Sequence, residues 1–110
     1  MIGARAIDIG ENTVIGDGTW INVNDPRLSS ISIGSNSLVG MDNFFSVGSK
    51  ITIDDYFLSG ARCSFICSSH KIQDVSRPYL KTGTTREDEI HIGKNVFLGY
   101  NVSILGNVSI

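Results

Sequence analysis

The chain has little of several ingredients on which other folds and binding sites depend. Only two prolines, two cysteines and one tryptophan occur among its 110 residues. Its apolar runs are far shorter than the roughly eighteen residues of a membrane-spanning helix, and no segment has the spacing of a long amphipathic helix. Nine basic and eleven acidic residues leave a net charge of −2, which gives no positive field for nucleic acid. Without a signal peptide or a lipidation motif, we expect one cytoplasmic domain over residues 1–110 with very little helix.

The two cysteines also limit the chemistry that is available. Cys63 and Cys67 stand four residues apart. Two thiols cannot complete a structural zinc site, and they are difficult to bridge when they lie on one strand. We interpret them as buried free thiols and expect no bound metal.

Glycine, by contrast, is plentiful and regularly placed. Eight of the twelve glycines directly follow a residue of one recurring series, which advances mostly in steps of six and whose members we call anchors. All anchors except Ser59 are apolar. They are Ile9, Ile15, Ile21, Ile33, Val39, Val47, Ile53, Ser59, Phe65, Ile92, Leu98, Ile104 and Ile110. A fixed period of this kind indicates a repeat architecture and outranks local propensity.

Each anchor is expected to end a short strand. A small or apolar residue stands two positions before most anchors, so both side chains point to the same face of the strand. The glycine that follows permits a sharp corner, because a Cβ would clash there or because φ is unusual. Three strands and three corners make a triangular coil of eighteen residues, and such coils stack about 4.8 Å apart. This period places Ile15 beneath Ile33.

Three irregular steps interrupt the series. Twelve residues separate the anchors on either side of 24–29, which fit a bulged turn. The next irregular step, from Val39 to Val47, is eight residues long. It has two residues more than the usual six, and we place them around 41–44. The longest step is twenty-seven residues and places a loop at about 68–89, which contains Pro78 and many charged side chains. A long excursion from a rigid solenoid is typical of a functional segment.

From Ile51 onward the residues resemble a known family. The segment ITIDDYFLSGARCSFICSSH, the charged loop and the segment IHIGKNVFLGYNVSILGNVSI are similar to the hexapeptide-repeat acyltransferases, most of all to their galactoside, maltose and polysaccharide O-acetyltransferase branch. The resemblance implies a left-handed parallel β-helix of a little over four triangular coils with one long loop. It also implies a homotrimer with active sites between subunits, which transfers an acetyl group from acetyl-CoA directly to a saccharide hydroxyl.

The resemblance further implies which residues act on the acceptor. His70 has the position of a histidine at the root of the loop, and we expect it to be the general base, because imidazole can accept a hydroxyl proton near neutral pH. Asn43 is either a turn-former or an acceptor-site ligand that stabilises an oxyanion. Independently of the resemblance, Asp74 and Arg77 in the same charged loop either orient His70, contact sugar hydroxyls or are simply solvated.

On the donor side, this chain has Phe97-Leu98-Gly99 where the family usually has tryptophan, isoleucine and glycine. We expect Phe97, Gly99 and Tyr100 to flank the channel for the acyl donor, with packing alone as the alternative for the two aromatic residues. His91 stands between two apolar residues of the series and should point outward in a structural or interfacial role.

Other functions are weaker or excluded. A non-catalytic β-helix that serves as a trimerisation or regulatory module needs neither His70 nor the loop; the loop favours the enzyme, and the short chain favours the module. A γ-type carbonic anhydrase shares the fold but needs three zinc-binding histidines, whereas this chain has two. Ice binding needs regular outward ranks of threonine, which are missing. The sequence stops on the anchor Ile110, where the family continues, so we expect a form that lacks C-terminal coils and binds acetyl-CoA weakly, or an inactive truncated transferase.

Overall fold

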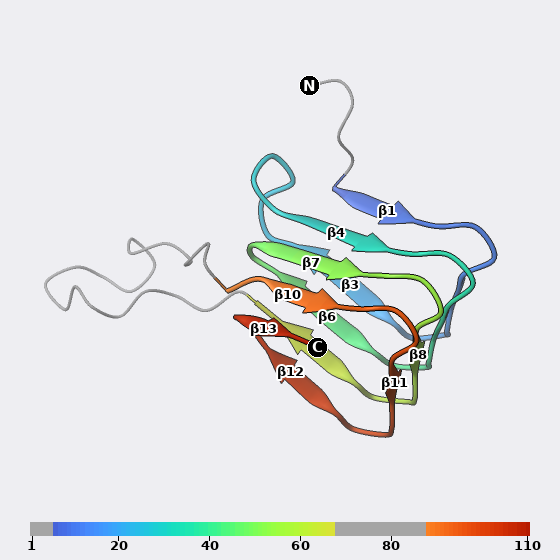
Figure 1. Ribbon diagram of the computed structural model, residues 1–110. Helices are drawn as coiled ribbons and strands as arrows, with labels where there is room; N and C mark the ends of the chain where they lie inside the picture. Colours follow the sequence, from blue (N-terminus) through green and yellow to red (C-terminus); the bar gives the residue numbers. More distant parts are fainter. Residues whose placement is uncertain (1–5, 68–87) are drawn as a thin grey trace, which may run out of the picture.

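The fold consists of parallel strands in three sheets, which the chain visits in turn (Figure 1). The computed structural model describes residues 6–67 and 88–110, and all regular elements in these ranges are strands. Sheet A contains β1 (Ile7–Ile9), β4 (Ser30–Ile33), β7 (Lys50–Ile53), β10 (Ile90–Ile92) and β13 (Val108–Ser109). Sheet B contains β2 (Val14–Ile15), β5 (Leu38–Val39), β8 (Leu58–Ser59) and β11 (Phe97–Leu98). Sheet C contains β3 (Trp20–Val23), β6 (Phe44–Val47), β9 (Ser64–Ile66) and β12 (Ser103–Leu105).

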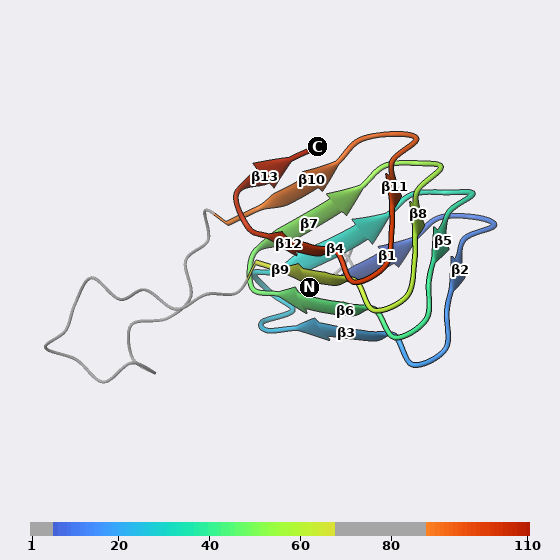
Figure 2. The same cartoon turned by 90° about the horizontal axis from the view of Figure 1, so that it is seen from below.

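The three sheets stand as three walls around an interior (Figure 2). We call one passage through sheets A, B and C a coil. The arrangement is compatible with a parallel β-helix, and the prediction of an all-β fold with parallel stacked strands is confirmed for the described residues. No helix that could cross a membrane occurs within 6–67 or 88–110.

The coils do not share one length, and this corrects the predicted stacking. Ile15 pairs with Val39 rather than lying beneath Ile33. Along sheet A the aligned residues are Ile7, Ile31, Ile51, Ile90 and Val108. Successive steps along this row are therefore 24, 20, 39 and 18 residues, and only the last has the predicted length.

The residues that lengthen a coil beyond the predicted eighteen all lie at one corner, between sheets C and A. Aligned positions are seven residues apart between sheets A and B, and six apart between B and C, in every coil. The predicted turn at 24–29 is present at the C–A corner, where the Ser29 N–H donates to the Asp25 carbonyl at 2.7 Å. The two extra residues of the next coil lie there as well, at 47–50, so their predicted place around 41–44 is wrong. Phe45, not Val47, aligns with Ile21 and Phe65.

Close approach between coils explains the anchor glycines at 10, 16, 34, 40 and 60, whereas an added Cβ on Gly99 would have no atom within 4 Å. A Cβ on Gly16 would lie 2.6 Å from the Gly40 carbonyl carbon, and a Cβ on Gly40 would lie 2.5 Å from the Gly60 carbonyl oxygen. Among the described glycines only Gly18 has a positive φ. Of the two predicted reasons for these glycines, steric exclusion is therefore the right one at the anchor corners.

Left-handed backbone occurs instead three residues after the anchors. Most residues there are asparagine or aspartate, which tolerate this conformation better than other side chains do. They are Asn12, Asn36, Asp42, Asn95, Asn101 and Asn107, with φ between 55° and 63°. Tyr56 and Arg62 hold equivalent corner positions, each with a φ of 61°, although neither side chain favours it.

The interior is apolar and is centred on three phenylalanines. The rings of Phe45 and Phe65 stack with centroids 4.4 Å apart, and Phe57 meets Phe65 edge-on at 6.1 Å. All three rings are buried, so their stacking stabilises the register of β6 on β9. Cys63 and Cys67 are buried free cysteines, as predicted, and burial raises the pKa of the Cys67 thiol above its ordinary value.

Candidate functional site

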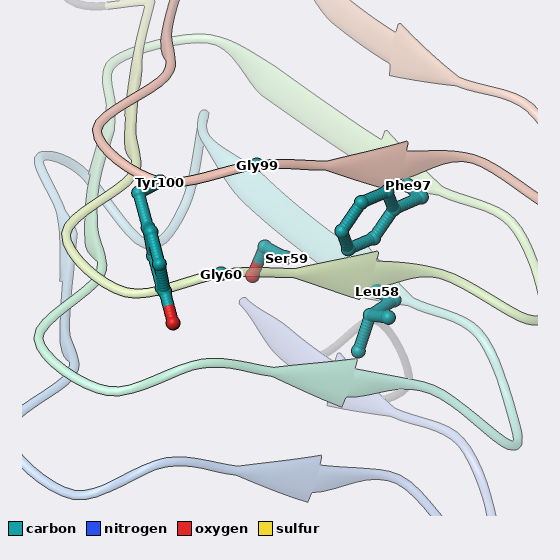
Figure 3. A pocket seen from close by; sticks show the side chains of 6 residues that line it. All are labelled: Leu58, Ser59, Gly60, Phe97, Gly99 and Tyr100. Atoms are coloured by element: carbon teal, nitrogen blue, oxygen red, sulfur yellow. The ribbon is translucent and has the colours of Figure 1, made fainter.

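A pocket of about 390 Å³ opens on the outer face of sheet B (Figure 3). Strands β8 and β11 and the turns that follow them supply its lining. The lining residues are Leu58, Ser59, Gly60, Phe97, Gly99 and Tyr100. The three donor-side residues predicted from the sequence, at 97, 99 and 100, therefore lie together around one hollow.

Two exposed aromatic side chains form the walls of this pocket. Phe97 is 67 % exposed because it alternates with the inward Leu98 on β11, and Tyr100 is 76 % exposed in the turn after that strand. The Tyr100 ring hangs across Gly60 of the neighbouring coil (Figure 3). A Cβ on Gly60 would lie only 2.9 Å from Tyr100 Cδ1, so the Tyr100 ring can occupy this position because residue 60 has no side chain.

The pocket offers apolar surface and no charge. No Asp, Glu, His, Lys or Arg side chain lines it, and the Ser59 hydroxyl is already engaged inside the coil. It donates to Asn43 Oδ1 at 2.7 Å and accepts from the Gly40 N–H at 3.1 Å. An uncharged ligand group can lie between the two aromatic rings, but a general base must come from outside these lining residues.

Asn43 belongs to a ladder of interior side chains that donate to the glycine carbonyl of the next coil. Thr19 Oγ1 donates to Gly40 O at 2.9 Å, Asn43 Nδ2 to Gly60 O at 2.9 Å, and Cys63 Sγ to Gly99 O at 3.0 Å. These three donors occupy the same corner position in successive coils. The series explains why a polar residue or a cysteine stands at a position that faces the core.

The side-chain amide of Asn43 has little left to offer a substrate. The residue is 1 % exposed, and its Nδ2 also donates to Met41 O at 3.0 Å while its Oδ1 accepts from Ser59. Both donors of the amide are used within the coils, behind the floor of the pocket. Of the two roles considered for Asn43, the geometry favours the structural one at the turn, and nothing in it supports contact with an acceptor.

The three remaining residues predicted for the acceptor side, His70, Asp74 and Arg77, lie outside the described residues. The strands on either side of this segment in the sequence are described. Strand β9 ends and β10 begins at the C–A corner, on the opposite side of the molecule from β8 and β11 (Figure 2). The interior of the coils therefore separates this corner from the aromatic pocket.

His91 points outward from sheet A, as its place between two apolar residues predicts. Its Nε2 lies 3.3 Å from Asp54 Oδ2, and both side chains are partly exposed. A second, smaller hollow of about 290 Å³ surrounds it, lined by Glu89, His91, Asn107, Val108 and Ser109. Within the described ranges no group of three or more metal-binding side chains converges, here or elsewhere.

Sequence reasoning missed the half of the pocket that β8 supplies. Leu58 aligns with Phe97 and Ser59 with Leu98, although thirty-nine residues separate the members of each pair. The anchors Ser59 and Leu98 were both visible in the series. Stacking the two anchors directly across the loop would have brought Leu58 and Gly60 into the same site.

Comparison with known proteins adds no relative for the chain. No family model, curated protein or solved structure matches it.

Proposed function

We propose that the chain is an acetyl-CoA-dependent O-acetyltransferase of the hexapeptide-repeat type, which acts on a saccharide hydroxyl. In this proposal the three sheets are the walls of a left-handed parallel β-helix of a little over four coils. His70 is the general base, and the enzyme works as a homotrimer in the cytoplasm. The resemblance of residues 51–110 to that family is the starting point, and the aromatic pocket on sheet B is the observation that carries the proposal furthest.

The pocket suits the uncharged part of an acyl donor. Its aromatic walls and glycine floor leave an open groove without acidic side chains, Lys, Arg or His, which fits an acyl group with its thioester and pantetheine arm better than a phosphate. Remote contacts of this kind position a thioester for attack. Asp74 and Arg77 stay in the proposal as acceptor-side residues, whereas Asn43 does not, because its amide donors are used between coils.

The separation between the pocket and the C–A corner favours a shared active site. His70 follows β9 by only a few residues, and the described end of β9 lies across the coils from the pocket. A second copy whose C–A corner meets sheet B of the first would bring the base and the donor groove together. The outward column of Val14, Leu38, Leu58 and Phe97 on sheet B supports such contact, because it is an aligned row of apolar side chains on an outer face.

A non-catalytic trimerisation module remains the second candidate. It is favoured by one observation: the six residues that line the pocket include no histidine and no carboxylate. The same apolar column on sheet B would then serve assembly alone. The two candidates make different predictions for His70.

The test is acetyl transfer from acetyl-CoA to galactosides, maltose and oligosaccharides. The reaction is measured by the release of the free CoA thiol. Replacement of His70 with alanine should lower kcat by about a hundredfold or more while the far-ultraviolet circular dichroism stays unchanged. Phe97→Ala should mainly raise the KM for acetyl-CoA, because it removes a donor contact and leaves the base in place.

Two results would contradict the enzyme. Transfer by His70→Ala at a rate close to that of the unaltered protein would remove the base from the proposal. A stable monomer at micromolar concentration, measured by sedimentation, would exclude a shared active site. A trimer that is folded but inactive with every acceptor would favour the module.

A further inference from the structure

The outer face of sheet C has a composition that neither of the other faces shares. Its eight outward positions form two aligned rows across β3, β6, β9 and β12. The first row is Trp20, Phe44, Ser64 and Ser103. The second row is Asn22, Ser46, Ile66 and Leu105. No charged side chain stands at any of these positions, although twenty of the 110 residues are charged.

The first row begins with an aromatic platform. Trp20 is 64 % exposed, and its ring centroid lies 5.8 Å from that of Phe44 at an interplanar angle of 57°. An exposed tryptophan presents a large flat apolar surface with one donor at its edge. The interior of sheet C is already filled by Phe45 and Phe65, so burial of the core does not require this pair.

Hydrogen-bonding groups continue the same two rows. The hydroxyls of Ser64 and Ser103 follow the aromatic pair, and no other described residue bonds to them. Beside Trp20, Asn22 Nδ2 donates to Asn24 Oδ1 at 3.3 Å, which leaves its other donor and its Oδ1 toward solvent. Flat apolar surface and neutral donors and acceptors are therefore mixed within one face.

The other two faces lack this combination. Sheet B presents the apolar column described above, which has no hydrogen-bonding side chain among its four members. Sheet A presents a polar row with ionisable groups: Asp8, Ser32, Thr52, His91 and Ser109. A protein surface would suit sheet B, and an ionic ligand would suit sheet A. Sheet C suits a ligand that is neutral, rich in hydroxyls and flat on one side.

We propose that the outer face of sheet C binds a neutral oligosaccharide, with one sugar ring stacked on Trp20 and the next on Phe44. The C–H bonds on one side of a pyranose pack against the negative face of an aromatic ring, and its hydroxyls bond to amides and hydroxyls at the ring edge. Neighbouring strands lie about 4.8 Å apart, which is close to the advance of one hexose along an extended glycan. The row from Trp20 to Ser103 therefore places one side chain, which we call a rung, beside each successive sugar. This site is distinct from the pocket on sheet B, and binding to it requires no transfer reaction.

The experiment uses Trp20 as its own reporter, because it is the single tryptophan of the chain. Tryptophan emission of the full chain is recorded while cellohexaose or maltohexaose is added, with glucose at equal sugar-unit concentration as the control ligand. One hexasaccharide should shift the emission saturably, with a dissociation constant of roughly 1 mM or below. Phe44→Ser should weaken binding about tenfold, and serine already occupies the next two rungs of that row. Leu38→Ser, on sheet B, should leave binding unchanged.

A second variant tests the site without altering the aromatic pair. Ser64→Asp places a charge on the third rung at a partly exposed position and should also weaken binding. The proposal is overturned if neither hexasaccharide gives a saturable change, or if glucose acts equally well. It also fails if both sheet C variants bind like the unaltered protein, or if acrylamide cannot reach Trp20 because a second copy covers the face. None of these outcomes bears on acetyl transfer, so the proposed function is tested separately.

Discussion

Two corners of each coil have the same number of residues in every coil, whereas the number at the third corner varies widely. Between sheets A and B, and between B and C, the step from one aligned position to the next never changes. Between sheets C and A, the same step is eleven, seven, twenty-six and five residues in successive coils. The extra turn at 24–29 lies at this corner, and residues 68–87 stand in the sequence between β9 and β10.

The physical difference lies in how the backbone is held. At the two invariant corners, glycines let successive coils approach too closely for a Cβ, and interior donors bond to the glycine carbonyls above them. Corner side chains add to this, as when Asp55 Oδ1 accepts from the Ser35 N–H at 2.8 Å. An inserted residue there would break several contacts at once. At the C–A corner the chain can bulge into solvent, where a longer loop costs little free energy.

The largest expected effect comes from inserting Gly-Ser at each kind of corner. Between Ser35 and Asn36 the insertion should abolish cooperative folding, because it displaces the Asn36 N–H from the Glu11 carbonyl and the Ser35 carbonyl from the Tyr56 N–H. Between Arg27 and Leu28 the same insertion should cost about 1 kcal/mol or less. Thermal unfolding, monitored by circular dichroism, distinguishes the two insertion variants. Equal losses of stability would mean that the two kinds of corner do not differ.

A glycine pair gives the next largest effect. Gly40→Ala should destabilise the protein by about 3 kcal/mol or more, because the new Cβ would lie 2.5–2.7 Å from backbone atoms of residues 59 and 60. Gly99→Ala is the matched control, since Gly99 has the same corner position and no atom within 4 Å of its added Cβ. Urea unfolding should show little change for the control. Similar losses in both variants would mean that close approach is not the reason for these glycines.

Replacement of Asn43 tests the interior ladder. Asn43→Ala should cost about 2–3 kcal/mol in urea unfolding, because it leaves the Met41 and Gly60 carbonyls and the Ser59 hydroxyl without their buried partner. The exposed Asn22→Ala should change stability by less than about 0.5 kcal/mol. An Asn43→Ala protein of unaltered stability would reopen the acceptor-site role for this residue.

The smallest effect is a gain. Tyr56→Asn should stabilise the protein by about 0.5–1 kcal/mol, since asparagine adopts a φ near 61° with less strain and stands at the equivalent corners 12, 36 and 95. The reciprocal change Asn36→Tyr should lose a similar amount. Calorimetric melting temperatures that move the same way for both variants would show that corner strain does not decide stability here.

Sequence reasoning recovered the stacked parallel strands but misplaced part of their register. The anchor series predicted parallel strands, stacked apolar rows and corners at glycine, and these predictions are confirmed for the described residues. It erred at Val47, which it treated as the equivalent of Ile21, because Phe45 and Val47 both point inward on a longer strand. Apolar periodicity alone cannot tell which of two inward residues meets the next coil.

The candidate site was recovered on one strand and missed on the other. Phe97, Gly99 and Tyr100 were predicted together because they are close in the chain, whereas Leu58 and Gly60 join them only through strand pairing across the loop. Asn43 looked like a turn residue or a ligand, since its sequence neighbours gave no hint of the Gly60 carbonyl that it binds. The predictions for His70, Asp74 and Arg77 stand as they were made.

The sequence by itself determined that this chain coils, because a six-residue period of inward apolar side chains and glycines has few other ways to bury its core. It also determined that one segment interrupts the coils. Tertiary structure alone decided which residues became neighbours across those interruptions, and so which outer face became purely apolar, which ionisable, and which a mixture of aromatic rings and neutral polar groups. The reason is geometric: strand pairing aligns residues by the length of each coil, and the anchor series does not tell which inward residue beside the C–A corner, Phe45 or Val47, meets the neighbouring coil.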